Sequence, residues 1–384
     1  MSSTTEKPYV LRWGIVGCGG ISSSFAKDLV LAPSTRNVSD VAHAIAACGS
    51  RSLEKAEEFI KGNCPEGGCA QVAGYVKSKP VAKGNYEDVF KHEDVDIIYI
   101  GTPHTSHYVD CKAALESGKH VLLEKPATLN QAEFIALGEM AKSKKLFLME
   151  AVWTRFFPLV QELQDVLFKE QAIGEIRRVN SDFSLAFLNN VPKTHRLLNP
   201  ELAGGGLLDL GPYPLVWAML TLFQNPKNER SPPTNITASM IKDESGIDLF
   251  TNWTLDFPKL GARAALSVTV TVNSPKDCVT RIQGTKGEVV LPWPTARPDT
   301  FTIRRSQEGL RPQPYVEDIR TFPIVGTGLH WEADAVARSI RDGRLENEKM
   351  PISETILTMG IFDKVRRLGG YVFPDGLEKV TTKK

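Results

Sequence analysis

The sequence predicts an α/β fold: an N-terminal domain built on a parallel sheet, followed by an α+β domain with a largely antiparallel, open sheet. Strand and helix signals alternate over the first 150 residues, and a glycine-rich turn separates the first strand from the first helix. After Pro233 the chain changes to alternating β patterns joined by short turns. We place the domain boundary so that the domains cover residues 1–151 and 152–384, with the last helix free to pack back on the first domain.

The N-terminal domain is expected to hold a six-stranded sheet. Five of its parallel strands are placed at residues 10–17, 43–50, 95–102, 120–126 and 146–150, and helices are predicted at about 21–29, 53–60, 109–117 and 130–145. The strand at 95–102 is continuously apolar, which is typical of a parallel strand covered on both faces. Residues 62–84 are rich in Gly, Pro and Lys and are predicted to form an extended loop.

The second domain is predicted to contain two helices, then a run of strands, and finally two helices that close the chain. The helices are expected at about 158–170, 206–223, 331–341 and 354–368, and the strands at 237–241, 249–257, 262–272, 280–291 and 300–306.

Composition excludes several classes of protein. The chain has 384 residues, 42% hydrophobic and 24% charged, with 46 Lys and Arg against 45 Asp and Glu. It therefore has the make-up of a globular protein and no general positive field to attract nucleic acid or a membrane surface. We see no apolar run as long as a membrane span and no signal-peptide core, so we expect a cytoplasmic protein.

The six cysteines are too few for a disulfide scaffold, so we expect reduced thiols. Cys64 and Cys69 are close in sequence, but no further ligands with zinc-site spacing stand near them. We predict no metal site.

A dinucleotide-binding motif lies at the end of the first strand. In Gly17-x-Gly19-x-x-Ser22, the first glycine allows the tight turn, the second lets the backbone approach a pyrophosphate, and the small serine allows close helix–strand packing. Gly20 and Ile21 open a helix whose N-terminal N–H groups favour an anion. The motif predicts a Rossmann domain; a tight turn without a ligand is the alternative.

The end of the second strand favours NADP over NAD. NAD enzymes usually place a carboxylate there for the ribose hydroxyls, whereas this chain has Ser50, Arg51 and Ser52. Cationic and hydroxyl donors suit a 2′-phosphate. The alternative is that Arg51 is a solvated residue at the start of a helix.

Polar residues follow three further strands, at the sheet edge where ligands bind in open α/β sheets. They are Thr102, Pro103, His104 and His107; Glu124 and Lys125; and Trp153 and Arg155. Lys125 is the most informative, because a desolvated lysine can lower its own pKa or that of a neighbouring acid. His104 and His107 lack a third ligand, so a metal is not indicated.

The segments GCGGIS, GTPHTSH and EKP, followed by an antiparallel second domain, resemble the family of glucose–fructose oxidoreductase and inositol dehydrogenase (Gfo/Idh/MocA). The resemblance covers nearly the full length. The segments MEAVWTRFFPL, HRLLNPELAGGGLLDLGPYPL, RIQGTKGEV and GLHWEADAVARSIRDGRLE are closer to one branch, that of dimeric dihydrodiol dehydrogenase and the fungal NADP-dependent D-xylose dehydrogenases. The loop at 62–84 is longer than this branch leads us to expect.

The resemblance implies roles for several residues. Tyr213 stands where the branch has its acid/base, Lys125 would lower the pKa of that phenol, and Asp209 would orient Lys125 or bind a substrate hydroxyl. It also places the loop with His104 and His107 beside the nicotinamide ribose. Trp153 and Arg155 resemble residues near the nicotinamide and the substrate mouth, and a substrate role is open to His195, Arg196 and Asn199. The alternatives are packing for Tyr213, helix capping for Asp209, an interdomain stack for Trp153 with Arg155, and surface or capping roles for the last three.

These observations together favour an NADP-dependent dehydrogenase that oxidises a ring hydroxyl of an aldopyranose. The first candidate reaction is the oxidation of D-xylose to its lactone. The alternatives are a trans-dihydrodiol dehydrogenase acting on aromatic diols and a catalytically silent NADP-binding sensor. The expected partners are the small-molecule sugar or diol substrate and a second copy of the chain, since the resemblance implies dimerisation through the open sheet.

Overall fold

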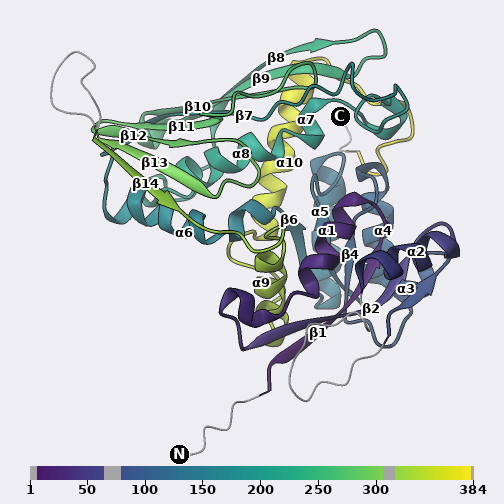
Figure 1. Cartoon of the computed structure of the whole chain (residues 1–384). Coiled ribbons are helices and arrows are strands. Elements are labelled where there is room, and N and C mark those ends of the chain that lie inside the picture. The colour runs from purple at the N-terminus through teal and green to yellow at the C-terminus, as the bar shows by residue number, and fades with distance from the viewer. Residues whose placement is uncertain (1–6, 65–78, 306–315, 382–384) are drawn as a thin grey trace, which may run out of the picture.

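Two sheets organise the chain in the computed structural model, which describes residues 7–64, 79–305 and 316–381 (Figure 1). The first is six-stranded and parallel, with the order β3-β2-β1-β4-β5-β6. Its strands are β1 (Tyr9–Val16), β2 (Val41–Gly49), β3 (Val81–Lys83), β4 (Ile97–Ile100), β5 (His120–Glu124) and β6 (Leu148–Ala151). Its helices are α1 (Gly20–Leu29), α2 (Leu53–Asn63), α3 (Glu87–Phe90), α4 (His104–Glu116) and α5 (Gln131–Lys144). The predicted Rossmann-type sheet is confirmed.

Two predicted boundaries in this domain are wrong. Helix α4 begins at His104, five residues before the predicted start, because the polar residues of its first turn hide the helical pattern in the sequence. The expected loop at 62–84 contains the short edge strand β3. Residues 65–78, and with them Cys69, lie outside the described residues.

The second sheet has eight strands in the order β14-β13-β12-β11-β7-β10-β9-β8. They are β7 (Ile176–Asp182), β8 (Thr234–Lys242), β9 (Asp248–Phe257), β10 (Ala262–Thr269), β11 (Thr280–Gly284), β12 (Gly287–Leu291), β13 (Thr300–Arg305) and β14 (Val316–Thr321). Strand β7 pairs antiparallel with β11 and parallel with β10, so it joins two antiparallel halves. The largely antiparallel sheet is confirmed, but β7 and β14 were not predicted.

The predicted helix at 206–223 is interrupted. Helix α7 (Gly206–Asp209) ends before Gly211, and α8 (Pro212–Ala218) follows. A side chain at Gly211 would lie 2.1 Å from the Leu207 carbonyl oxygen, so the chain turns there at close range. Pro200–Phe223 is long and apolar enough for a membrane span by composition, contrary to our reading of the sequence, yet its apolar window is 100% buried inside the protein.

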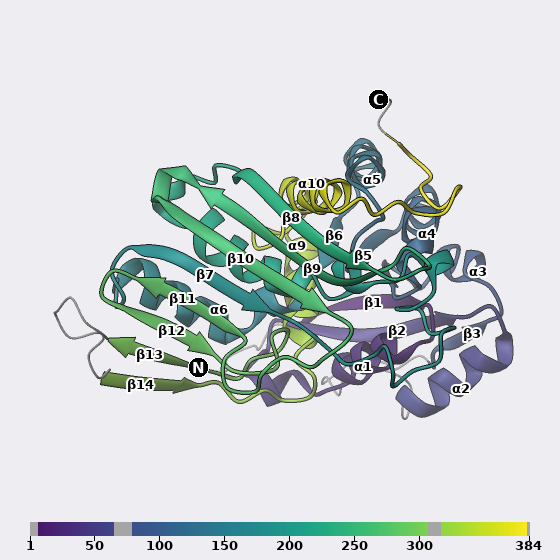
Figure 2. The same cartoon turned by 90° about the horizontal axis from the view of Figure 1, so that it is seen from above.

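The two closing helices connect the sheets (Figure 1). Helix α9 (His330–Arg341) packs on α1, β1 and β2. Helix α10 (Ile352–Leu368) contacts α5 and β6 on one side and β8 on the other. Helix α6 (Pro158–Gln164) lies under the second sheet, whose opposite face carries no helix among the described residues (Figure 2).

Buried polar contacts fix α9 on the first domain. The Asp28 carboxylate accepts three N–H groups at 2.8 Å from the chain just before this helix. Arg36 donates to both carboxylate oxygens of Asp334 at 2.7 Å, and a ring nitrogen of His43 lies 2.9 Å from Asp334. Burial raises the pKa of Asp334, but Arg36 and His43 outweigh it and hold this pKa at about 2.

We expect Asp334→Asn to lower the free energy of unfolding by about 3 kcal/mol at neutral pH, because it leaves the buried Arg36 without its counter-charge. Since the folded-state pKa of Asp334 is depressed, its contribution is present above its unfolded pKa and is lost as the pH falls through about 2. Urea denaturation measures the change. The control is Asp342→Asn at the exposed end of the same helix, which should cost under about 1 kcal/mol. Equal losses of unfolding free energy in the two variants would show that Asp334 does not fix α9 on the first domain.

Candidate active site

A cleft of about 550 Å³ lies where the carboxyl ends of the first sheet face α7 and α8. It brings together residues from seven separate stretches of the chain. The predicted residues that line it are Gly17, Gly19, Gly20, Ile21, Ser50, Arg51, Thr102, Pro103, His104, His107, Glu124, Lys125, Arg196, Asp209 and Tyr213. The topology accounts for this, because parallel strands deliver their carboxyl ends to one edge.

The glycine turn has the shape that a pyrophosphate requires. Gly17 has a φ of +84°, and a side chain there would lie 2.7 Å from the Gly101 backbone. A Cβ at Gly19 or Gly20 would meet no described atom within 4 Å, so the space above the α1 N-terminus is open to a ligand. Ser22 Oγ donates to the Gly17 carbonyl at 2.5 Å and thereby ties the glycine turn to the first turn of α1. The residues present therefore fit a dinucleotide.

Two cations lie at the far end of the cleft. Arg51 and Lys55 line it with Ser50 and Tyr86, and within the described part of the chain neither cation forms an ion pair. Ser52 has a different use, since its Oγ caps α2 by accepting the Lys55 N–H at 3.4 Å. This end can hold a phosphate, as predicted for NADP.

His104 and His107 lie on the first turn of α4 and are buried. Nε2 of His104 lies 3.1 Å from the Ala203 carbonyl oxygen, which links the two domains. Burial lowers the pKa of both rings, that of His107 to about 4, so both are neutral. Within residues 7–64, 79–305 and 316–381 no cluster of three metal-ligating side chains occurs.

Lys125 bridges the two domains at the centre of the cleft. It follows β5, and its Nζ donates to the backbone carbonyl of Asp209 at 2.7 Å. The same Nζ lies 3.5 Å from Asp209 Oδ1 and 4.9 Å from the centroid of the Tyr213 ring. One ammonium therefore touches both of the residues that the sequence placed in the catalytic segment.

The charges around Lys125 are balanced. Burial raises the pKa of Asp209, but Lys125 and Arg196 outweigh it and hold this pKa well below its usual range. Burial lowers the pKa of Lys125, but Asp209 and Tyr213 outweigh it, so its pKa lies above the ordinary value. The sequence left two effects open for Lys125, a lowering of its own pKa or of that of a neighbouring acid. The second is present at Asp209, and the first is absent because this buried carboxylate stabilises the ammonium.

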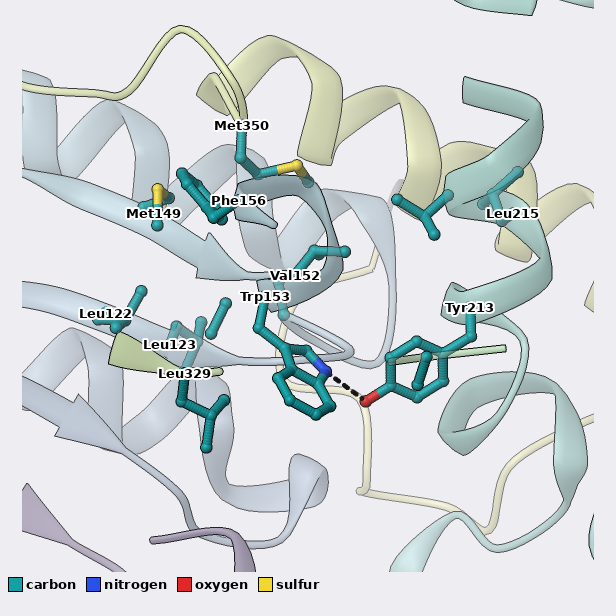
Figure 3. Packing of buried hydrophobic residues seen from close by; sticks show 14 of the residues in the cluster. Leu122, Leu123, Met149, Val152, Trp153, Phe156, Tyr213, Leu215, Leu329 and Met350 are labelled. Carbon is teal, nitrogen blue, oxygen red and sulfur yellow. Dashed lines mark hydrogen bonds between the residues drawn. The ribbon is translucent and has the colours of Figure 1, made fainter. Parts of the chain in front are cut away.

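Tyr213 is a buried phenol with a hydrogen-bond donor aimed at its oxygen. Trp153 Nε1 donates to Tyr213 Oη at 3.1 Å (Figure 3), and Phe183 meets the ring edge-on at 5.0 Å. Burial raises the pKa of Tyr213; Lys125 and Trp153 lower it, Glu124 raises it, and the result lies above the ordinary value. The expected lowering by Lys125 is present but does not outweigh burial.

Four predicted residues do not line the cleft. Arg155 points away from it, and its Nη2 lies 2.6 Å from Glu354 with both side chains 1% exposed. The Asn199 side chain caps the turn Pro200–Leu202, and the His195 ring stacks on Phe187 at 5.6 Å. Trp153 acts through Tyr213, as described above.

Sequence reasoning missed Cys18, Lys55, Tyr86 and Gly101, all of which line the cleft. Lys55 had a usable signal, because it lies one helical turn after Arg51 at the start of a predicted helix. Tyr86 carried none, since its segment lies between predicted elements.

The comparisons with known proteins agree with this arrangement. Residues 11–152 match a profile described as "Oxidoreductase family, NAD-binding Rossmann fold", and residues 160–290 match the "GFO/IDH/MocA C-terminal domain". D-xylose 1-dehydrogenase (NADP(+)) of Hypocrea jecorina is 37% identical, covering 96% of this chain and 94% of that protein. Trans-1,2-dihydrobenzene-1,2-diol dehydrogenase of Bos taurus is 33% identical, covering 95% and 98%. The crystal structure of aldose-aldose oxidoreductase from Caulobacter crescentus, complexed with glycerol, superimposes with a TM-score of 0.73 at 23% identity, covering 94% and 97% of the two chains.

We expect Trp153→Phe to raise the pKa of Tyr213 by about one unit, because a hydrogen bond to a charged acceptor contributes about 1.5 kcal/mol or more. NMR of protein labelled at tyrosine Cζ, with Tyr213→Phe for assignment, measures this pKa. Trp331→Phe is the control, since Trp331 packs on the ring of Phe157 as Trp153 does. An unchanged Tyr213 pKa in Trp153→Phe would show that the hydrogen bond is unimportant.

Proposed function

The chain belongs to the oxidoreductase family with an NAD-binding Rossmann fold and a GFO/IDH/MocA C-terminal domain, and from this premise we propose an NADP-dependent dehydrogenase that oxidises a ring hydroxyl of an aldopyranose. D-xylose, oxidised to its lactone, is the first candidate substrate. The observation that carries the proposal is the contact of Lys125 with both Asp209 and Tyr213 beside an open glycine turn.

Two substrate classes have specific support. The relative named D-xylose 1-dehydrogenase (NADP(+)) is 37% identical over nearly the whole chain, which favours an aldose and NADP. The relative named as a dihydrobenzenediol dehydrogenase is 33% identical, and Phe183, with Trp293 stacked on it at 5.3 Å, places aromatic rings beside Tyr213. A trans-dihydrodiol is therefore the second candidate. Retention of both Lys125 and Tyr213 argues against a silent sensor.

The chain's own residues divide the work of cofactor binding. The backbone of the glycine turn and the α1 N-terminus would hold the pyrophosphate, and Arg51 with Lys55 would hold the 2′-phosphate. Bound NADP supplies the hydride acceptor of the reaction.

Tyr213 handles the proton. In the oxidation, the Tyr213 phenolate accepts the proton of the substrate hydroxyl, and Lys125 and Trp153 stabilise the anion. Because the pKa of Tyr213 is raised in the protein, the phenolate fraction and the oxidation rate should increase with pH. The neutral phenol donates the proton in the reverse direction.

We expect Tyr213→Phe and Lys125→Met each to lower kcat at least about 100-fold, the usual contribution of a positioned acid/base, with NADP affinity nearly unchanged. Tyr9→Phe and Lys119→Met are matched controls, because both residues lie outside the cleft, and should keep normal turnover. Near-normal turnover in either cleft variant would overturn the mechanism.

NADPH formation measured by absorbance with D-xylose, D-glucose, L-arabinose and a trans-dihydrodiol decides the substrate class. We expect the highest kcat/KM with D-xylose. A higher value with the dihydrodiol would select the second candidate, and no activity with any of the four would refute both.

We expect Arg51→Ala and Lys55→Ala each to reduce the NADP-over-NAD ratio of kcat/KM about 10-fold, since each removes one charge-assisted contact to the 2′-phosphate. Lys61→Ala, at the opposite end of α2, is the control. A ratio that does not change in Arg51→Ala would contradict NADP selection by this residue.

The chain's partner in solution is proposed to be a second copy. The support is the face of the eight-stranded sheet that no described helix covers (Figure 2). Sedimentation equilibrium should give twice the mass of one chain, and a monomer at micromolar concentration would contradict this. The cytoplasmic location stays a prediction.

A further inference from the structure

The glycine turn that precedes α7 is held by a buried carboxylate. We propose that Asp248 is a positioning residue for the proposed reaction: it fixes the glycine turn Gly204–Gly206 and thereby places Asp209 under Lys125. The proposal rests on the function proposed above. Asp248 is the first residue of β9, is 0% exposed and does not line the cleft, so it acts only through other residues.

The carboxylate of Asp248 fits this turn closely. Its Oδ2 accepts the Leu207 N–H and the Thr251 hydroxyl, both at 2.8 Å. Its Oδ1 faces Gly205, which has a φ of +112°, and a Cβ at that position would lie 2.0 Å from this oxygen. A glycine is therefore required where the carboxylate is closest.

Two other side chains hold the same turn from different elements. Tyr371, which follows α10, donates its hydroxyl to the Gly204 carbonyl at 2.5 Å. The His104 ring lies 3.1 Å from the Ala203 carbonyl oxygen. The turn is thus fixed from the second sheet, the C-terminal segment and the first domain at once.

The position of the turn determines the position of Asp209. Helix α7 is only four residues long, from Gly206 to Asp209, so fixing the Leu207 N–H fixes the whole helix. The carbonyl of Asp209 is the acceptor that holds Lys125 over Tyr213. Movement of the turn therefore moves the ammonium away from the phenol.

The environment of Asp248 suggests a substitution that removes its charge but keeps the oxygen that accepts the Leu207 N–H. Burial raises its pKa to about 7, and its contacts with Thr251 and Leu207 offset only part of this. Burial and the nearby Asp248 charge both raise the pKa of Tyr371. Among the described residues Oδ1 has no hydrogen-bond partner, so Asp248→Asn can keep the accepting oxygen at the Oδ2 position and place its amide where Oδ1 was.

The experiment compares Asp248→Leu, which removes the acceptor, with Asp248→Asn, which keeps it. We expect Asp248→Leu to lower kcat about 10-fold or more and to shift the pH of half-maximal oxidation upward by about one unit, because Tyr213 loses the nearby ammonium. NADP affinity, measured by fluorescence titration, should stay within about 2-fold. Asp248→Asn should stay within about 3-fold of the wild-type kcat, with an unchanged pH profile.

Tyr371→Phe provides a second, milder variant, since it removes only the hydroxyl donated to Gly204, and should shift kcat and the pH profile in the same direction. If Asp248→Leu does not fold, kcat and the pH profile of Tyr371→Phe and Asp248→Asn test the positioning role instead. Wild-type kcat and pH profile in Asp248→Leu, or in Tyr371→Phe where that variant decides, would overturn the positioning role even if stability falls. If the wild-type protein turns over none of the candidate substrates, the proposed function fails; the pKa of Tyr213, read by NMR in the same variants, then decides the positioning role alone.

Discussion

The hydrogen bond from Lys125 Nζ to the Asp209 carbonyl is the interaction on which the site depends. It joins the end of β5 in the first sheet to the end of α7 beneath the second, across 84 residues of sequence. A buried ammonium is costly unless it is paired. Asp209 supplies that pairing, and the pair leaves the ammonium over the Tyr213 ring. The arrangement that balances these charges is therefore also the one that the proposed proton transfer requires.

The rest of the fold keeps the two halves of this contact in place. Helix α9 is clamped to the first domain by Asp334 and Asp28, and α10 packs against both domains. The first sheet then supplies the open glycine turn and the cationic end of the cleft. Helix α8, next to the second sheet, supplies Tyr213, whose ring packs against Phe183. A dinucleotide and a small cyclic alcohol would meet where these parts join.

Much of this was predictable from the sequence because it is encoded locally. The glycine turn, the strand ends and the catalytic segment each occupy a short stretch, and parallel topology brings them to one edge. Strand β7 was missed because exposed Arg177 and Arg178 interrupt its alternation. Strand β14 was missed because its half-buried residues, Asp318 and Arg320, are charged, whereas its apolar Val316 and Ile319 are exposed. Arg155 was misplaced because its partner Glu354 is distant in sequence. The pKa of Tyr213 depends on burial, which no local pattern reports.

The most direct test of the account is the pKa of Tyr213 in the wild-type protein and in Lys125→Met, measured by NMR of labelled tyrosine Cζ. The account predicts a wild-type pKa above that of free tyrosine, because the phenol is buried, and a further increase of about one unit or more in the variant, because the ammonium is lost. The same pKa in both proteins would contradict the claim that Lys125 prepares Tyr213 for proton transfer.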